Sequence, residues 1–98
     1  MKEKEHTGGS VSYYRVHISD PTSDDLPPYT MECNDAIEAL GMTYAEANVF
    51  KAIWRKCAAR NLGLEKAGNN EIYDAEKCVY FSNRILVTDK RKQKEDQK

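Results

Sequence analysis

The segment that decides the fold reads TYAEANVFKAIWRKCAARN and spans residues 43–61. It opens with Thr43 and Glu46 at the spacing of a capping box, in which each side chain accepts a hydrogen bond from a free backbone amide at the start of a helix. Apolar residues then recur at helical spacing and share one face. They are Ala47, Phe50, Trp54, Cys57 and Ala58. The segment therefore predicts a long helix with one buried face.

Two further helices are predicted on either side of this segment. The first runs from about Thr30 to Gly41, because a glycine suits the left-handed residue that ends a helix. The second runs from about Asn70 to Val87, after a glycine- and asparagine-rich loop. Their apolar residues also recur at spacings of three and four. In the earlier helix these are Cys33, Ala36, Ile37 and Leu40, and in the later one Ile72, Ala75, Cys78, Val79, Phe81, Ile85 and Leu86.

The expected fold is mainly α: a three-helix bundle with an extended N-terminal segment and disordered charged tails. Residues 1–28 are expected to form a flexible leader followed by an acidic, proline-rich linker. Within them, residues 11–18 are a candidate short strand, but no second strand pattern is evident to pair with it. Residues 29–88 would form the helical domain, and residues 89–98 a charged, disordered tail.

Composition narrows the classes of function. Fifteen basic against sixteen acidic residues leave a net charge of −1, so a nucleic-acid partner is not expected. No apolar run is long enough to cross a membrane, and the charged start is no secretory signal. The odd number of cysteines indicates free thiols in a reducing cytoplasm, and their spacing predicts no metal site built from cysteine.

The predicted core is small for a stable domain. Three short helices bury few apolar side chains, and chains with thin cores often gain stability by association. Six tyrosines, two phenylalanines and one tryptophan are more aromatic surface than such a bundle covers alone. We therefore expect a homo-oligomer.

A polar row on the central helix is the candidate site. Asn48, Lys51 and Arg55 are spaced three and four apart and share a face beside the apolar row. An arginine fork and a lysine charge together suit phosphate groups, and Lys77 of the last helix could support them. The expected ligand is thus a nucleotide or another phosphorylated molecule, which Asn48 would orient.

Carboxylates of the neighbouring helices would complete this site. Glu32 and Asp35 in the first helix and Asp74 in the last are the candidate catalytic residues. They would hold the Mg²⁺ that accompanies a nucleotide, or accept a hydroxyl proton. The same residues also fit a second interpretation, a structural network of ion pairs that joins the three helices. Spacing alone favours the network slightly.

Several positions carry a further signal: Tyr29, the string ECNDAIEAL at 32–40, Asn48, Lys51, Trp54, Arg55, Asp74, Lys77, Tyr80, Phe81 and the string RIL at 84–86. Their order and spacing resemble a family of small phage-encoded proteins of unknown function that includes the nucleotide kinase of a T-odd coliphage, an enzyme without a P-loop. The resemblance covers about three fifths of the chain. It implies a helical fold, a phage origin with a place in the host cytoplasm, and nucleotide binding with nucleoside monophosphate kinase-like activity.

Departures from this family keep other functions open. Ala47 stands where the family tends to have glycine, and Pro28 stands where a histidine commonly precedes the tyrosine. The alternative is a non-catalytic phage interaction protein that inhibits a host protein or sequesters a signalling nucleotide. A minor alternative follows from the acidic pairs at 32/35 and 71/74, which resemble those of all-helical nucleoside triphosphate pyrophosphohydrolases of the MazG type.

Overall fold

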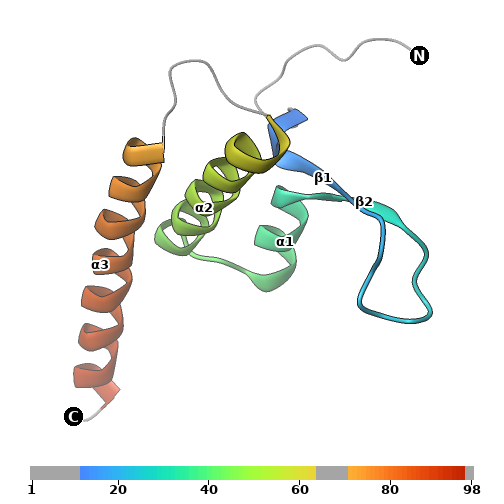
Figure 1. The fold of residues 1–98 in the computed structure, drawn as a ribbon. Helices are drawn as coiled ribbons and strands as arrows, with labels where there is room; N and C mark the ends of the chain where they lie inside the picture. Colours follow the sequence, from blue (N-terminus) through green and yellow to red (C-terminus); the bar gives the residue numbers. More distant parts are fainter. Residues whose placement is uncertain (1–11, 64–70, 97–98) are drawn as a thin grey trace.

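A computed structural model describes residues 12–63 and 71–96 of the chain (Figure 1). It confirms a mainly α protein with three helices, to which a short two-stranded sheet is added. The elements in chain order are a 3₁₀ turn η1 (Ser12–Tyr14), β1 (Arg15–Ile18), β2 (Tyr29–Glu32), α1 (Cys33–Leu40), α2 (Tyr44–Leu62) and α3 (Glu71–Asp96). The predicted leader before residue 12 and the loop at 64–70 lie outside the described residues.

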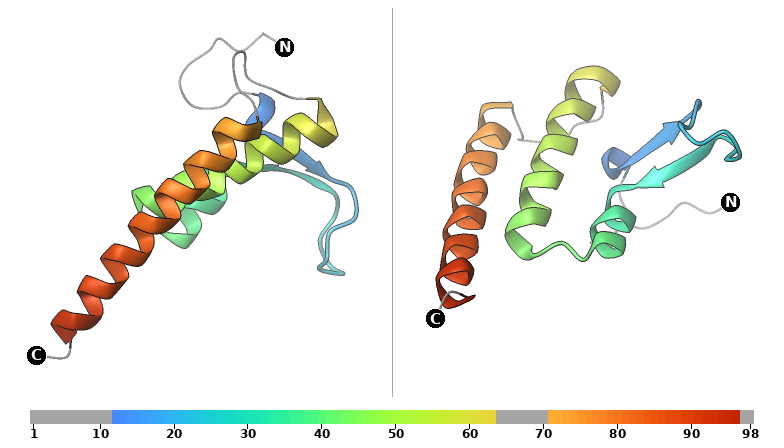
Figure 2. Two further views of the ribbon diagram at one scale, coloured as in Figure 1. Left: turned by 60° about the vertical axis from the view of Figure 1, so that its left-hand side comes forward. Right: turned by 90° about the horizontal axis from the view of Figure 1, so that it is seen from below.

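Helix α2 is the central element. Its partner along most of its length is α3, while α1 and the β1–β2 hairpin lie on the opposite side (Figures 1 and 2). The 3₁₀ turn η1 also packs against α2. A side chain on α2 that lies between these two layers can therefore contact both the hairpin side and α3.

The expectation that residues 11–18 have no partner strand inside the chain was wrong. β1 pairs antiparallel with β2, in a register that sets Arg15 opposite Glu32 and Ile18 opposite Tyr29. Residues 30–32 were assigned to the first helix, but they follow the prolines at 27 and 28, which favour an extended backbone. The helix begins only at Cys33, after Glu32 in an extended conformation.

The helix boundaries set by capping were predicted correctly. The Glu46 amide donates to Thr43 Oγ1 at 3.2 Å, and the Thr43 amide donates to Glu46 Oε1 at 2.9 Å, which completes the capping box of α2. At the end of α1, Gly41 has φ 62°, and its amide donates to the carbonyl of Glu38. This left-handed conformation is one that glycine adopts without strain.

The prediction of a disordered tail at 89–98 was wrong for the residues that the structure describes. Helix α3 does not end near Val87 but continues to Asp96. The added segment is rich in lysine, arginine, glutamine and glutamate, which have high helix propensity. Oppositely charged side chains also stand four apart, as in Arg91 and Glu95, which supports an exposed helix.

The described core is small. Its fully buried apolar residues are only Cys33, Ala52 and Ala58. On α3 the predicted apolar surface divides into two rows: Cys78, Phe81 and Ile85 are partly buried, whereas Ile72, Val79 and Leu86 are exposed. Helix α3 thus turns one apolar row towards α2 and leaves another uncovered.

Candidate functional site

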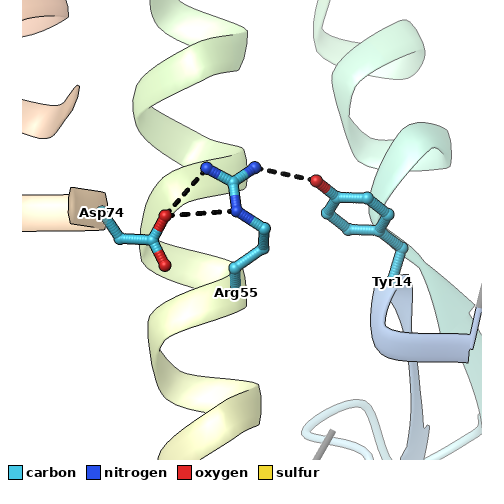
Figure 3. Close-up of polar contacts among 3 residues, drawn as sticks. All are labelled: Tyr14, Arg55 and Asp74. Carbon is cyan, nitrogen blue, oxygen red and sulfur yellow. Dashed lines mark hydrogen bonds and ion pairs between the residues drawn. The ribbon is translucent and has the colours of Figure 1, made fainter. Parts of the chain in front are cut away.

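The most buried polar group of the described chain is an ion pair between α2 and α3. Arg55 donates from Nη2 and Nε to Asp74 Oδ1, at 2.9 and 3.2 Å (Figure 3). Arg55 is 8% exposed and Asp74 is 0% exposed. The third contact of the guanidinium is to the hairpin side, where Arg55 Nη1 donates to the Tyr14 hydroxyl at 2.8 Å. One side chain thus connects η1, α2 and α3.

The electrostatics of this cluster favour a charged arginine and a neutral tyrosine. Burial on its own lowers the pKa of Arg55, but the hydrogen bonds to Tyr14 and Asp74 outweigh it, and the pKa is raised. Burial raises the pKa of Tyr14, although the hydrogen bond from Arg55 opposes this change. The guanidinium is therefore held as a cation with its donors directed at partners within the protein.

Of the other predicted ligand-binding residues, Lys51 lies beside this cluster, whereas Asn48 and Lys77 make their contacts elsewhere. Lys51 places its Nζ 5.6 Å from the centre of the Tyr14 ring, which brings it to the same cluster as Arg55. Asn48 Nδ2 donates to the carbonyl of Tyr44 at 2.8 Å, within its own helix. Lys77 lies on α3 with its Nζ 5.4 Å from the centre of the Tyr73 ring.

The three candidate catalytic carboxylates are not gathered into one group. Asp74 pairs with Arg55, whereas Glu32 pairs with Arg15 across the hairpin, with Arg15 Nε donating to Glu32 Oε2 at 3.2 Å. Asp35 is exposed on the first turn of α1, on the other side of α2 from α3 (Figure 1). Within residues 12–63 and 71–96, no group of three or more histidine, cysteine or acidic residues has the arrangement of a metal site.

A second ion pair joins the same helices at the surface, one turn nearer the start of α3. Lys56 Nζ donates to Glu71 Oε1 at 2.9 Å, and Arg60 lies 3.9 Å from the same oxygen. The hydrogen bond from Lys56 lowers the pKa of Glu71. Glu71 was considered part of an acidic pair with Asp74, but the two carboxylates are directed at different cations of α2.

The sequence reasoning missed the role of the 3₁₀ turn. Tyr14 accepts from Arg55, and the carbonyl of Tyr13 accepts from Trp54 Nε1 at 2.9 Å. Both tyrosines were assigned to a strand whose position was unknown. Their pairing with α2 could not be inferred from spacing, because each bond joins residues 41 positions apart.

An apolar groove lies next to this cluster on α2, with a volume of about 370 Å³. Its lining residues are Val16, Phe50, Ile53, Trp54, Cys57, Ala58, Asn61 and Leu62. Trp54 was predicted to be a core residue, but it is only partly buried, and its ring lies 5.9 Å from that of Phe50 along the groove. Asn61 is the one lining residue with a polar side chain besides the indole N–H that Trp54 uses towards Tyr13.

Comparisons with protein-family models, with curated proteins and with solved structures give no match to this chain. None of the described helices combines the length and the apolar character needed to span a bilayer.

Proposed function

We propose that the chain is a non-catalytic interaction protein that holds an apolar segment of a partner protein in the groove on α2. The observation that carries this proposal is the contrast between two neighbouring surfaces. Arg55, which was predicted to bind phosphate, has its donors engaged within the fold, whereas an aromatic and aliphatic groove beside it is open.

The charge cluster supports a structural role. A phosphate at Arg55 would have to take the donors that now contact Asp74 and Tyr14. Removing those donors would leave the carboxylate of Asp74 buried next to a competing anion, which is costly in a low-dielectric setting. Arg55 therefore serves to join α2 to its neighbours, and the structural-network interpretation of the polar row is the better supported one.

The groove has the character of a protein-docking surface. Ile53 and Leu62 are 47% and 51% exposed at its rim, and Trp54 and Phe50 form its aromatic part. Tryptophan, tyrosine and arginine supply most of the binding energy at protein interfaces, and aromatic side chains are enriched at their centres. A phosphorylated ligand would need several convergent polar groups, and this lining offers few. An aliphatic or aromatic anchor of a partner protein suits it.

The resemblance to phage proteins suggests what kind of partner the groove binds. A phage-encoded chain of this kind would bind a host protein, as the alternative prediction from the sequence states. The nucleotide kinase-like activity stays a prediction. Lys51 is the cation that could still contact a phosphate, and the titration below tests nucleotide binding at this residue.

The test uses the full chain as bait for a display library of short random peptides. We expect the enriched peptides to carry apolar or aromatic anchors, and we expect Ile53→Asp to weaken their binding by about tenfold or more. Leu40→Asp is the matched control, because Leu40 is 73% exposed on α1 and does not line the groove. This control should bind as the parent chain does.

Nucleotide binding is tested separately, by chemical-shift titration of labelled protein with a nucleotide panel, with and without Mg²⁺. The proposal predicts no saturable shifts at Lys51 or Arg55. Saturable shifts there, or a peptide library that yields no binder sensitive to Ile53→Asp, would overturn the docking function and return the nucleotide prediction to first place.

A further inference from the structure

Helix α3 carries an apolar row that the described chain does not cover. Ile72, Val79 and Leu86 stand seven residues apart and are 69%, 64% and 52% exposed. They were predicted to lie in the core, but α3 turns its other row, with Phe81 and Ile85, towards α2. A row repeated every seven residues follows one side of a helix for its whole length.

The residues between them have the spacing of a coiled-coil seam, but they are polar, so only one of its two positions is apolar. Glu76, Asn83 and Lys90 alternate with the apolar three, so that the spacing along the face is four, three, four, three and four. All three are exposed. Tyr80 and Val87 lie next to the seam and are 59% and 36% exposed. The seam from residue 72 to residue 90 is about 27 Å long at the rise of an α-helix.

The need for a partner follows from the small core. No large apolar side chain of the described residues is fully buried, since the buried apolar set contains one cysteine and two alanines. Chains that bury so little by themselves usually gain stability by association. A second copy of the same chain brings an identical apolar row, so each row can cover the other.

The charges on this face distinguish between the two ways of pairing identical helices. Glu76 stands towards its N-terminal end, and Lys90 and Lys94 stand towards its C-terminal end. A parallel pair would set each of these charges beside its own copy. An antiparallel pair sets the acidic end of each helix beside the basic end of the other, which is electrostatically favourable.

We propose that the chain forms a two-fold symmetric dimer in which the outer faces of two α3 helices pack antiparallel. In such a closed dimer the same patch is used on both copies, so the outer apolar row of α3 is covered on each. Asn83, near the middle of the seam, lies between Val79 and Leu86, where a polar side chain selects the register of pairing. The proposal is independent of the groove on α2, because no groove-lining residue belongs to α3.

The first test is sedimentation equilibrium of the full chain over a range of concentrations. We expect a monomer–dimer equilibrium whose dissociation constant rises about 100-fold in Val79→Asp, because a carboxylate then faces the apolar seam. Ile53→Asp is the matched control, since it also introduces an aspartate at an exposed apolar position, but on α2. It should leave the dimer unchanged, and circular dichroism should show that both variants remain folded.

Charge reversal tests the orientation. Glu76→Lys should weaken an antiparallel dimer about tenfold, because it places two basic ends together. Adding Lys90→Glu to the same chain should restore the dimer, since the ends are again opposite in charge. A chain that stays monomeric at all concentrations, a dimer insensitive to Val79→Asp, or a Glu76→Lys dimer as strong as the parent would overturn the proposal.

Discussion

Arg55 joins three segments of the chain through one buried guanidinium. Its contacts to Asp74 and Tyr14 are individually ordinary hydrogen bonds, but they hold α3 and η1 against opposite sides of α2. Both charges of the ion pair are almost fully removed from water. Such a pair stabilises the fold little more than apolar side chains of the same size would. Losing one member, however, leaves the other charge buried without a partner of opposite charge.

Replacing Arg55 by alanine is therefore expected to destabilise the fold by about 3–5 kcal/mol, a large share of the stability of a small domain. Urea unfolding followed by Trp54 fluorescence measures this change. Lys51→Ala is the control, because Lys51 contacts the Tyr14 ring without a hydrogen bond or ion pair to any described residue, and its loss should cost about 0.5–1 kcal/mol. An Arg55→Ala chain as stable as the parent would show that the ion pair is not structural.

The double change Arg55→Met with Asp74→Leu tests whether Arg55→Ala loses stability because the Asp74 charge is left unpaired or because side-chain packing is lost. It removes both charges and keeps apolar volume at the same place, so we expect it to recover most of the stability that Arg55→Ala loses. Recovery in the same urea experiment supports the structural role. If the double variant is as unstable as the single one, the geometry of the hydrogen bonds matters more than the charge.

Alkaline pH should destabilise the chain through Cys33 and Tyr14. Burial raises the pKa of the Cys33 thiol above its ordinary value of 9.0 and the pKa of the Tyr14 phenol above its ordinary value of 10.0. A raised pKa means that the folded state favours the protonated form. The stability from each group is therefore fully present below its ordinary value and is lost as pH rises through the raised one.

The measurement is the free energy of unfolding as a function of pH between about 7 and 11. We expect a decline that begins near the ordinary pKa of the thiol and steepens as the phenol titrates. Cys33→Ala should remove the earlier part of the decline and leave the later part. If the free energy of unfolding of Cys33→Ala falls just as steeply at the start of this range, groups other than Cys33 cause the early decline.

At the scale of the elements, the helices owe their boundaries to local interactions. The capping box at Thr43 starts α2, and glycines in the left-handed conformation end α1 and α2. The C-terminal third of α3 differs, because its residues are exposed on all sides and only helix propensity and surface charge pairs support it.

Thr43→Ala should cost about 1 kcal/mol, since it removes the acceptor for the Glu46 amide at the start of α2. Thr88→Ala is the matched control. The Thr88 hydroxyl donates to carbonyls within α3, whose backbone amides do not depend on it, so this change should be neutral or slightly stabilising. Thermal unfolding compares the two variants, and equal losses would contradict the role of the cap.

Hydrogen exchange tests the extension of α3 beyond Val87. Amides at 89–96 should exchange more slowly than in an unstructured peptide but much faster than amides at 74–85, where α3 packs against α2. If the amides of 89–96 exchange as fast as those of an unstructured peptide, this segment is disordered, as its composition suggested.

At the scale of the whole molecule, the chain is a thin layered structure with little of its apolar surface buried. Helix α2 is covered on one side by α3 and on the other by the hairpin and α1 (Figure 2). Among residues 12–63 and 71–96, twelve large apolar side chains are exposed, including Ile53, Val79 and Tyr44. Both proposals assign such a surface to a protein partner, one to a different protein and one to a second copy.

If two copies pair through α3, thermal stability must depend on protein concentration. Association of folded chains stabilises them by mass action, so Tm should rise with concentration in the parent chain. In Val79→Asp the same dilution series should give a constant Tm. A parent Tm that does not change with concentration would mean that folding and association are not linked.

The sequence by itself determined the features that depend on neighbours along the chain. Three helices, the capping box of α2 and the glycine at the end of α1 were predicted because residues within four positions of one another create those signals. Arg55 and Asp74 were among the seven candidate site residues chosen from helical spacing, which could not tell that these two contact each other.

Only the tertiary structure decided what that group contacts and which faces stay open. Tyr14 reaches Arg55 from 41 positions away, and β2 pairs with β1 across a ten-residue connection that carries no periodic signal. Such contacts depend on how the helices pack, and so does the choice of which apolar row of α3 faces α2. Helix periodicity identifies apolar rows, but the competition between rows for one small interface is settled by three-dimensional fit.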